Sequence, residues 1–162
     1  MVDHGQTEEL ARRCGAAAEE IYRKKDYCCS EAVIVALNSA FEGGLDESQA
    51  AALGSGFCHG MGGAGCLCGA LAGAEIMLGL LLGPRREGGM EKKTFQSKVA
   101  MPMHDVFKEL YGATCCRVLK KRGKERGGVP CPELTRGGAE LAAAILLRWG
   151  NKEAVKLFEK EK

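Results

Sequence analysis

The sequence contains no C-x-x-C motif, although nine of its 162 residues are cysteines. This absence argues against a thioredoxin-like dithiol, a zinc ribbon and covalent haem attachment through C-x-x-C-H, which all use that spacing. A strong charge is also missing, because the formal net charge is only +2. The basic run RVLKKRGKER has no interleaved aromatic residues and indicates a solvated turn, so we expect no nucleic-acid binding.

Long hydrophobic runs are missing as well. The most apolar stretch, 67–83, is interrupted by Glu75 and is shorter than the roughly 20 residues that span a bilayer. The first residues, MVDHGQTEELARR, have no apolar core of the kind that a secretory signal needs. We therefore expect a cytoplasmic protein without membrane insertion. In a reducing compartment, an odd number of cysteines favours metal ligands or redox thiols over a framework of structural disulfides.

Alternation of apolar and polar residues, which is typical of a half-buried strand, is absent, so the sequence predicts an all-α protein. The length fits a single cysteine-rich domain over residues 1–162, built as a helical bundle of about six or seven helices with a Gly/Cys-rich loop. The expected elements are helices at 7–25, 29–41, 46–54 and 68–83, a kinked helix at 91–111, a short turn at 115–122 and a last helix at 132–149.

Several residues mark the expected ends and bends of these elements. Asp46 and Gln49 form a capping-box pattern, and Pro102 must kink or split the helix at 91–111. Thr114 is the expected N-cap of the turn at 115–122. Glycines recur every fourth residue at 65, 69 and 73, and this stripe predicts close packing of another helix.

Cysteines recur within a residue or two of the expected helix starts. At a helix start the backbone N–H groups are unpaired and the dipole is positive, so we expect this position to favour thiolate over thiol. Four such helix starts could converge on one site. Four thiolates suit zinc or an iron–sulfur cluster and two suit a dithiol/disulfide couple, and the spacing does not choose between them. The cysteines concerned are Cys28, Cys29, Cys66, Cys68, Cys115, Cys116 and Cys131.

Other residues could take part in such a site. His59 and His104 are possible ligands, although a lone histidine is more often an ordinary surface or core residue. Glu31 and Glu75 could carry protons, although a capping or partly exposed carboxylate is commoner. The segment GMGGAG at 60–65 matches G-x-G-x-x-G, but no strand precedes it, so it does not indicate a dinucleotide site.

The contexts of four cysteines resemble a family of proteins suspected of redox activity and named for a C…CGAxxG…C…C pattern. The central signature is CGALAG at 68–73; CSEAV follows the pattern at Cys29, and TCCRVL and CPEL place the last two cysteines at Cys116 and Cys131. The resemblance covers about residues 26–143 and implies a mostly helical protein with four functional cysteines. A similar domain, associated with an iron–sulfur centre, occurs in split-Soret cytochromes; this chain lacks the haem motif, so we expect no haem.

On this resemblance, Cys29, Cys68, Cys116 and Cys131 are the expected ligands of an iron–sulfur cluster, [2Fe–2S], that transfers electrons to or from an unidentified redox protein. The alternatives are a metal-free thiol–disulfide oxidoreductase that uses the same residues and a zinc-stabilised interaction module. Whether any substrate is turned over stays open, and a homodimer is as compatible with the glycine stripe as an internal core is. Weaker candidate ligands are Cys58, Cys66 and His59, and the expected spare thiols are Cys28 and Cys115.

Overall fold

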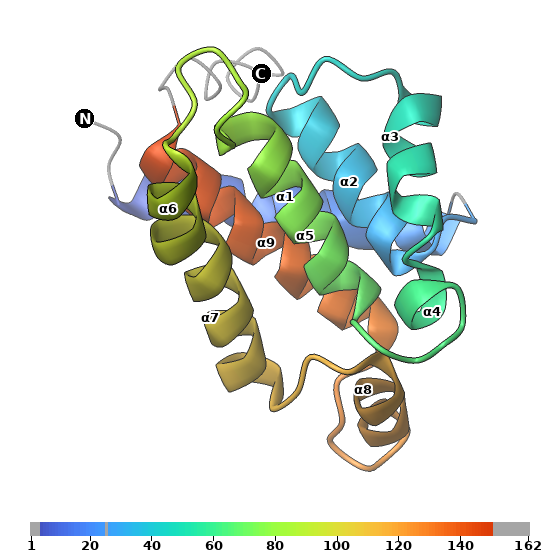
Figure 1. The fold of residues 1–162 in the computed structure, drawn as a ribbon. Coiled ribbons are helices and arrows are strands. Elements are labelled where there is room, and N and C mark those ends of the chain that lie inside the picture. Colours follow the sequence, from blue (N-terminus) through green and yellow to red (C-terminus); the bar gives the residue numbers. More distant parts are fainter. Residues whose placement is uncertain (1–3, 25, 151–162) are drawn as a thin grey trace.

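The computed structural model describes residues 4–24 and 26–150, which form helices that cross around a core of aliphatic and alanine side chains (Figure 1). The elements are, in chain order, α1 (His4–Lys24), α2 (Cys29–Ala40), α3 (Glu47–Ser55), α4 (Cys58–Met61), α5 (Gly69–Leu82), α6 (Lys92–Phe95), the π-helical turn η1 (Gln96–Ala100), α7 (Met101–Tyr111), α8 (Cys116–Gly123) and α9 (Cys131–Trp149). The described residues contain no strand, and seven of their helices have eight or more residues. The all-α prediction is therefore confirmed.

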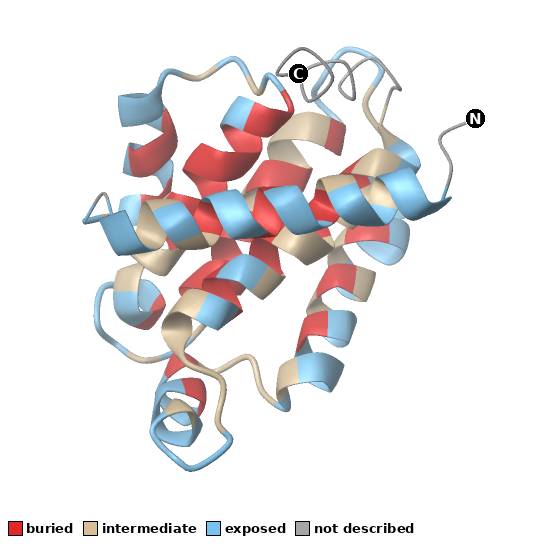
Figure 2. Cartoon of the chain, turned by 180° about the vertical axis from the view of Figure 1, so that it is seen from behind, coloured by how far each residue is buried: buried red, intermediate tan, exposed pale blue. Residues whose placement is uncertain are grey.

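The two longest helices, α1 and α9, pack most extensively against each other. Their backbones approach closely because α1 presents small residues there: a Cβ on Gly15 would lie 2.9 Å from the carbonyl oxygen of Arg136. Arg136 also pairs with Glu19 across this contact. Figure 2 shows α1 lying across the back of the molecule, with exposed residues alternating with buried ones along it.

Helix α5 packs between α2 and α9. A Cβ on Gly73 would lie 2.7 Å from the carbonyl oxygen of Ser30 in α2, and one on Gly138 in α9 would lie 2.7 Å from that of Ala70 in α5. The expected close packing along the glycine stripe is therefore confirmed for Gly69 and Gly73, which both face the start of α2. Gly65 lies before the helix and has a positive φ.

The stretch that was expected as one kinked helix consists of α6, η1 and α7 in succession. In a regular α-helix, Pro102 would leave one carbonyl without a donor and its ring would clash with that carbonyl. The wider turn η1 ends at Ala100, two residues before this proline, and provides the extra room. The α-helical pattern is thus interrupted before Pro102, while the backbone stays helical from Phe95 through Met101.

The predictions for the starts of α3 and α8 have different outcomes. Asp46 accepts a hydrogen bond from the backbone of Gln49 at 2.8 Å, so the capping box at α3 is confirmed. The expected turn at 115–122 is the helix α8, and its N-cap is Cys115, not Thr114. The carbonyl of Thr114 accepts from the backbone N–H of Cys68 at 2.7 Å, whereas the carbonyl of Cys115 accepts from the backbone N–H of Leu119 at 3.0 Å and so begins the helix.

No described helix combines the length and the apolar character needed to cross a bilayer. Lys25, the last residue of the first expected helix, lies outside the described residues, as do 1–3 and 151–162 of the expected domain.

Candidate functional site

Four helix starts carry a cysteine, as the sequence predicts. Cys29 is the first residue of α2, Cys68 is the N-cap of α5, and Cys116 and Cys131 are the first residues of α8 and α9. These helices come from distant parts of the chain, yet α5, α8 and α9 begin at the same end of the molecule (Figure 1). We refer to Cys29, Cys68, Cys116 and Cys131 as the four-cysteine site.

The four thiols lie close enough for their charges to interact. Burial is the main cause that raises the pKa of Cys29 to about 12 and that of Cys68 to about 11, and it also raises the pKa of Cys116. The negative charges of the other thiols add to this: Cys68, Cys116 and Cys131 act on Cys29; Cys116 and Cys131 act on Cys68; Cys131 acts on Cys116. Cys115, next to Cys116 in the chain, also acts on Cys116. The four cysteines of the site therefore lie near one another in the fold.

The structure corrects the expectation that the helix starts favour thiolate. Backbone N–H groups do lower the pKa of Cys68, through Leu71 and Ala70, but burial outweighs them. Only 5% of Cys68 is exposed, and water cannot solvate its anion. Deprotonation of these thiols at neutral pH therefore needs a compensating positive charge, such as that of bound metal ions.

A short antiparallel bridge between Leu67 and Cys115 holds two of the cysteines together. The backbone N–H of Cys68 donates to the carbonyl of Thr114, and that of Cys116 donates to the carbonyl of Cys66. The starts of α5 and α8 are thereby fixed side by side.

Glycines bring the backbone close to these sulfur atoms. A Cβ on Gly69 would lie 2.4 Å from Sγ of Cys29, and one on Gly60 would lie 2.5 Å from Cβ of Cys116. Gly60 also has a φ of 71°, which side chains other than glycine rarely tolerate. The glycine-rich segment is thus part of the wall of the four-cysteine site.

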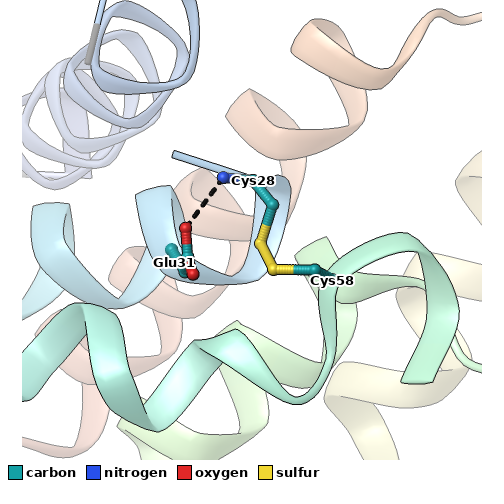
Figure 3. A group of neighbouring side chains, drawn as sticks. All are labelled: Cys28, Glu31 and Cys58. Atoms are coloured by element: carbon teal, nitrogen blue, oxygen red, sulfur yellow. Dashed lines mark hydrogen bonds between the residues drawn. A yellow bond between two sulfur atoms is a disulfide. The ribbon is translucent and has the colours of Figure 1, made fainter. Parts of the chain in front are cut away.

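Sequence reasoning missed a disulfide outside this site. Cys28 was expected to be a spare thiol, but its Sγ is bonded to Sγ of Cys58 at 2.09 Å (Figure 3). Cys58, a weaker candidate ligand, is consequently not available to a metal ion in this state. The sequence gives no signal for this pair, because the contact depends on how the loop before α5 folds back onto the start of α2.

The remaining candidates lie outside the four-cysteine site. Cys66 is an exposed thiol, and His59 is exposed in a left-handed turn. Cys115 has a free thiol, which donates to the carbonyl of Gly65 at 3.2 Å. His104 is on the surface, where Nδ1 lies 2.9 Å from the carboxylate of Asp105.

The two candidate proton carriers, Glu31 and Glu75, lie in different surroundings. Glu31 caps α2 by accepting from the backbone N–H of Cys28 at 3.0 Å, and it also accepts from the hydroxyl of Ser55 at 2.9 Å. Glu75 lies half-buried in α5, and this burial raises its pKa to about 7.

Comparison with known proteins gives one match. The profile of a family described as "Putative redox-active protein (C_GCAxxG_C_C)" matches residues 27–145, which include all of the four-cysteine site. No curated protein and no solved structure matches the chain. The family's name places glycine before cysteine, whereas this chain has Cys68 before Gly69. Because the match covers most of the chain, the protein belongs to the C_GCAxxG_C_C family.

Proposed function

We propose that the protein is an electron-transfer protein that binds a [2Fe–2S] cluster through Cys29, Cys68, Cys116 and Cys131. The observation that carries this proposal is that the four cysteines lie at the starts of four different helices, close enough for their charges to interact. Cysteine thiolates are the usual ligands of such clusters, and four of them complete the set.

The spacing of the sulfur atoms favours a cluster over a single zinc ion. In a tetrahedral zinc site the four sulfurs lie about 3.8 Å apart. Among the described residues, the one group with three ligand atoms within 4.8 Å of one another is Cys28, Glu31 and Cys58, which lies outside the four-cysteine site. No three sulfurs of the four-cysteine site lie this close together among the described residues, and this wider arrangement supports a group with more than one metal atom.

The chain supplies the surroundings that such a group needs. Cys68 and Cys116 are 5% and 7% exposed, so the protein excludes water from one side of the site. Backbone N–H groups of Ser30 and Leu71 stabilise negative charge on Cys29 and Cys68, and such hydrogen bonds raise a reduction potential. The cluster, when bound, takes up and releases one electron at a time.

An acidic redox protein is the partner that fits the surface beside Cys116. Helix α8 and the turn after it are strongly basic, and Lys120 is close enough to lower the pKa of Cys116 against the effect of its burial. A partner with an acidic surface would be steered to this face. The exposed basic residues are Arg117, Lys120, Lys121, Arg122, Lys124 and Arg126, with Glu125 as the single acidic residue among them.

Anaerobic purification followed by iron, sulfide and zinc analysis tests the cluster. We expect a brown protein with about two irons and two acid-labile sulfides per chain, and an electron paramagnetic resonance signal after one-electron reduction. A colourless protein with one zinc ion would identify a zinc-stabilised module instead. A colourless protein without metal would identify a metal-free thiol–disulfide protein.

A further inference from the structure

We propose that Cys28 and Cys58 form a second redox centre, a thiol–disulfide couple that a dithiol reduces and an oxidised dithiol restores. The pair joins the N-cap of α2 to the start of α4, with the two Cα atoms 5.6 Å apart. It shares no residue with the four-cysteine site and needs no metal.

Both sulfur-bearing residues are half-buried, so solvent reaches this disulfide more readily than it reaches the buried Cys68 and Cys116. The residues that follow Cys58 are also exposed, apart from Gly60. A reductant can therefore approach from this side without unfolding the core.

The two halves of the disulfide differ in how firmly they are held. Cys28 is anchored, because its backbone N–H donates to the carboxylate of Glu31 and it precedes a helix of 12 residues. Cys58 is followed by five residues with positive φ, including the non-glycine residues His59 and Met61, at 55° and 65°. Such angles are strained in residues with a side chain. Cleavage of the bond would let the Cys58 side relax while the Cys28 side stays in place.

The hydroxyl group of Ser30 can interact with the reduced form of the pair. The hydroxyl of Ser30 is buried and donates to the carbonyl of Gly54 at 2.7 Å, so its proton is already used. Its oxygen lies 3.2 Å from Sγ of Cys28 and 4.0 Å from Sγ of Cys58. After reduction, the Cys28 thiol can therefore donate to this oxygen.

Glu31 places a negative charge beside the disulfide (Figure 3). One of its carboxylate oxygens lies within 4.8 Å of both sulfur atoms. This charge repels the thiolate form of an attacking reductant and slows the exchange. The centre is therefore selective for a dithiol over two separate thiols. A dithiol carries its second thiol in the same molecule, so only one negatively charged reductant has to approach Glu31.

The exchange proceeds in two balanced steps. One thiolate of the dithiol attacks Sγ of Cys58; a mixed disulfide forms, the Cys28–Cys58 bond breaks, and its electron pair goes to Sγ of Cys28, which takes a proton. The second thiolate of the dithiol then attacks the other sulfur of the same dithiol, which is bonded to Cys58 in the mixed disulfide. Sγ of Cys58 is the leaving group and takes a proton. Two electrons and two protons pass to the protein, and the dithiol becomes a disulfide.

The test uses the folded chain and dithiothreitol as the dithiol. We expect peptide mapping of the oxidised protein to find Cys28 linked to Cys58, and dithiothreitol to expose two further thiols, at these positions, without a change in circular dichroism. Reoxidation with oxidised dithiothreitol should restore the same link. The proposal is overturned if the pair is not linked, or if dithiothreitol reduces it only in denaturant.

Variants separate this proposal from the cluster. Glu31→Gln should speed reduction by dithiothreitol about fourfold at low salt, as expected for one charge at this distance, and less at high salt. Ser55→Ala, which removes a hydrogen bond of Glu31 but keeps its charge, should not speed it. An equal rate in all three proteins would contradict the role of Glu31. Cys28→Ser with Cys58→Ser should abolish the reversible thiol change and retain iron, so iron content reports on the cluster and thiol mapping reports on the couple.

Discussion

Neighbouring cysteines in this chain have different chemistry because they occupy different positions at a helix start. Cys28 and Cys115 are N-caps with extended backbone, whereas Cys29 and Cys116 are the first helical residues. The N-cap side chains reach Cys58 and the carbonyl of Gly65, respectively. The first helical residues instead join the four-cysteine site.

Serine substitutions test this division at the residue scale. Replacing Cys29, Cys68, Cys116 or Cys131 by serine should remove most of the bound iron, because a serine oxygen is a poor ligand for iron–sulfur clusters. Cys28→Ser and Cys115→Ser are matched controls at adjacent positions and should retain it. Iron and sulfide content per chain is the measurement. Loss of iron in the controls, with retention in Cys29→Ser and Cys116→Ser, would show that the ligands are wrongly assigned.

Glu75 gives a prediction of pH dependence. Burial raises its pKa from 4.5 to about 7 in the folded protein, so between these values the folded state binds more protons than the unfolded state. Stability contributed by Glu75 is therefore present below pH 4.5 and is lost as the pH rises to 7. Glu75→Gln should raise the free energy of unfolding at pH 8 by on the order of 2 kcal/mol and have little effect near pH 4.5. Urea unfolding of both proteins at the two pH values measures this, and an equal gain at both would exclude titration of Glu75 as the cause.

At the scale of an element, we expect alanine substitutions at two glycines of helix α5 to have opposite effects. A Cβ on Gly69 would lie 2.4 Å from Sγ of Cys29, whereas one on Gly79 would meet no atom within 4 Å. Gly69→Ala should therefore lower iron content and stability together. Gly79→Ala should keep the iron and raise the free energy of unfolding by about 0.5–1 kcal/mol, because alanine loses less chain entropy on folding. Iron analysis and urea unfolding distinguish these outcomes; equal behaviour of the two variants would contradict the close approach at Gly69.

The helices that are long and periodic could be predicted from the sequence, because local spacing and stop signals determine them. The N-cap expected at Thr114 was wrong by one residue, since the carbonyl of Thr114 makes a long-range contact with the backbone N–H of Cys68 and α8 begins after Cys115. For the same reason the Cys28–Cys58 pair could not be predicted. The positions of the cysteines at helix starts were predictable, but the rise in their pKa values was not, because burial of a thiol is a property of the folded core.

The basic surface of α8 gives a prediction about electron transfer. Lys121→Glu with Lys124→Glu should slow oxidation of the reduced protein by ferricyanide, an anion, about tenfold at low salt, and speed oxidation by the cation hexaammineruthenium(III). Lys92→Glu with Lys93→Glu makes the same change on α6, far from α8 in Figure 1, and should alter neither rate by a comparable factor. Stopped-flow kinetics at several salt concentrations measure both reactions. Similar effects of the two double variants would exclude α8 as the docking surface.

At the scale of the whole molecule, α8 has little packing apart from its start at the four-cysteine site. It projects from the end of the helical assembly and packs mainly against the short α4 (Figure 1). Only Cys116 and Leu119 of its residues are buried. By contrast, α1, α2, α5 and α9 pack extensively against one another.

This unequal packing predicts how the protein responds to loss of iron. Bonds from Cys116 to a bound cluster would add to the few contacts that hold α8, so removing the cluster should loosen α8 before the rest of the fold. We expect amide hydrogen exchange over residues 116–123 to become about tenfold faster or more after chelation of iron, with little change in α1 and α9. Mass spectrometry of anaerobic samples before and after chelation measures this, with Cys116→Ser as a matched sample that should already exchange fast. Uniform acceleration across all helices would mean that the cluster stabilises the whole fold equally, and no acceleration in α8 would mean that Cys116 is not bound to it.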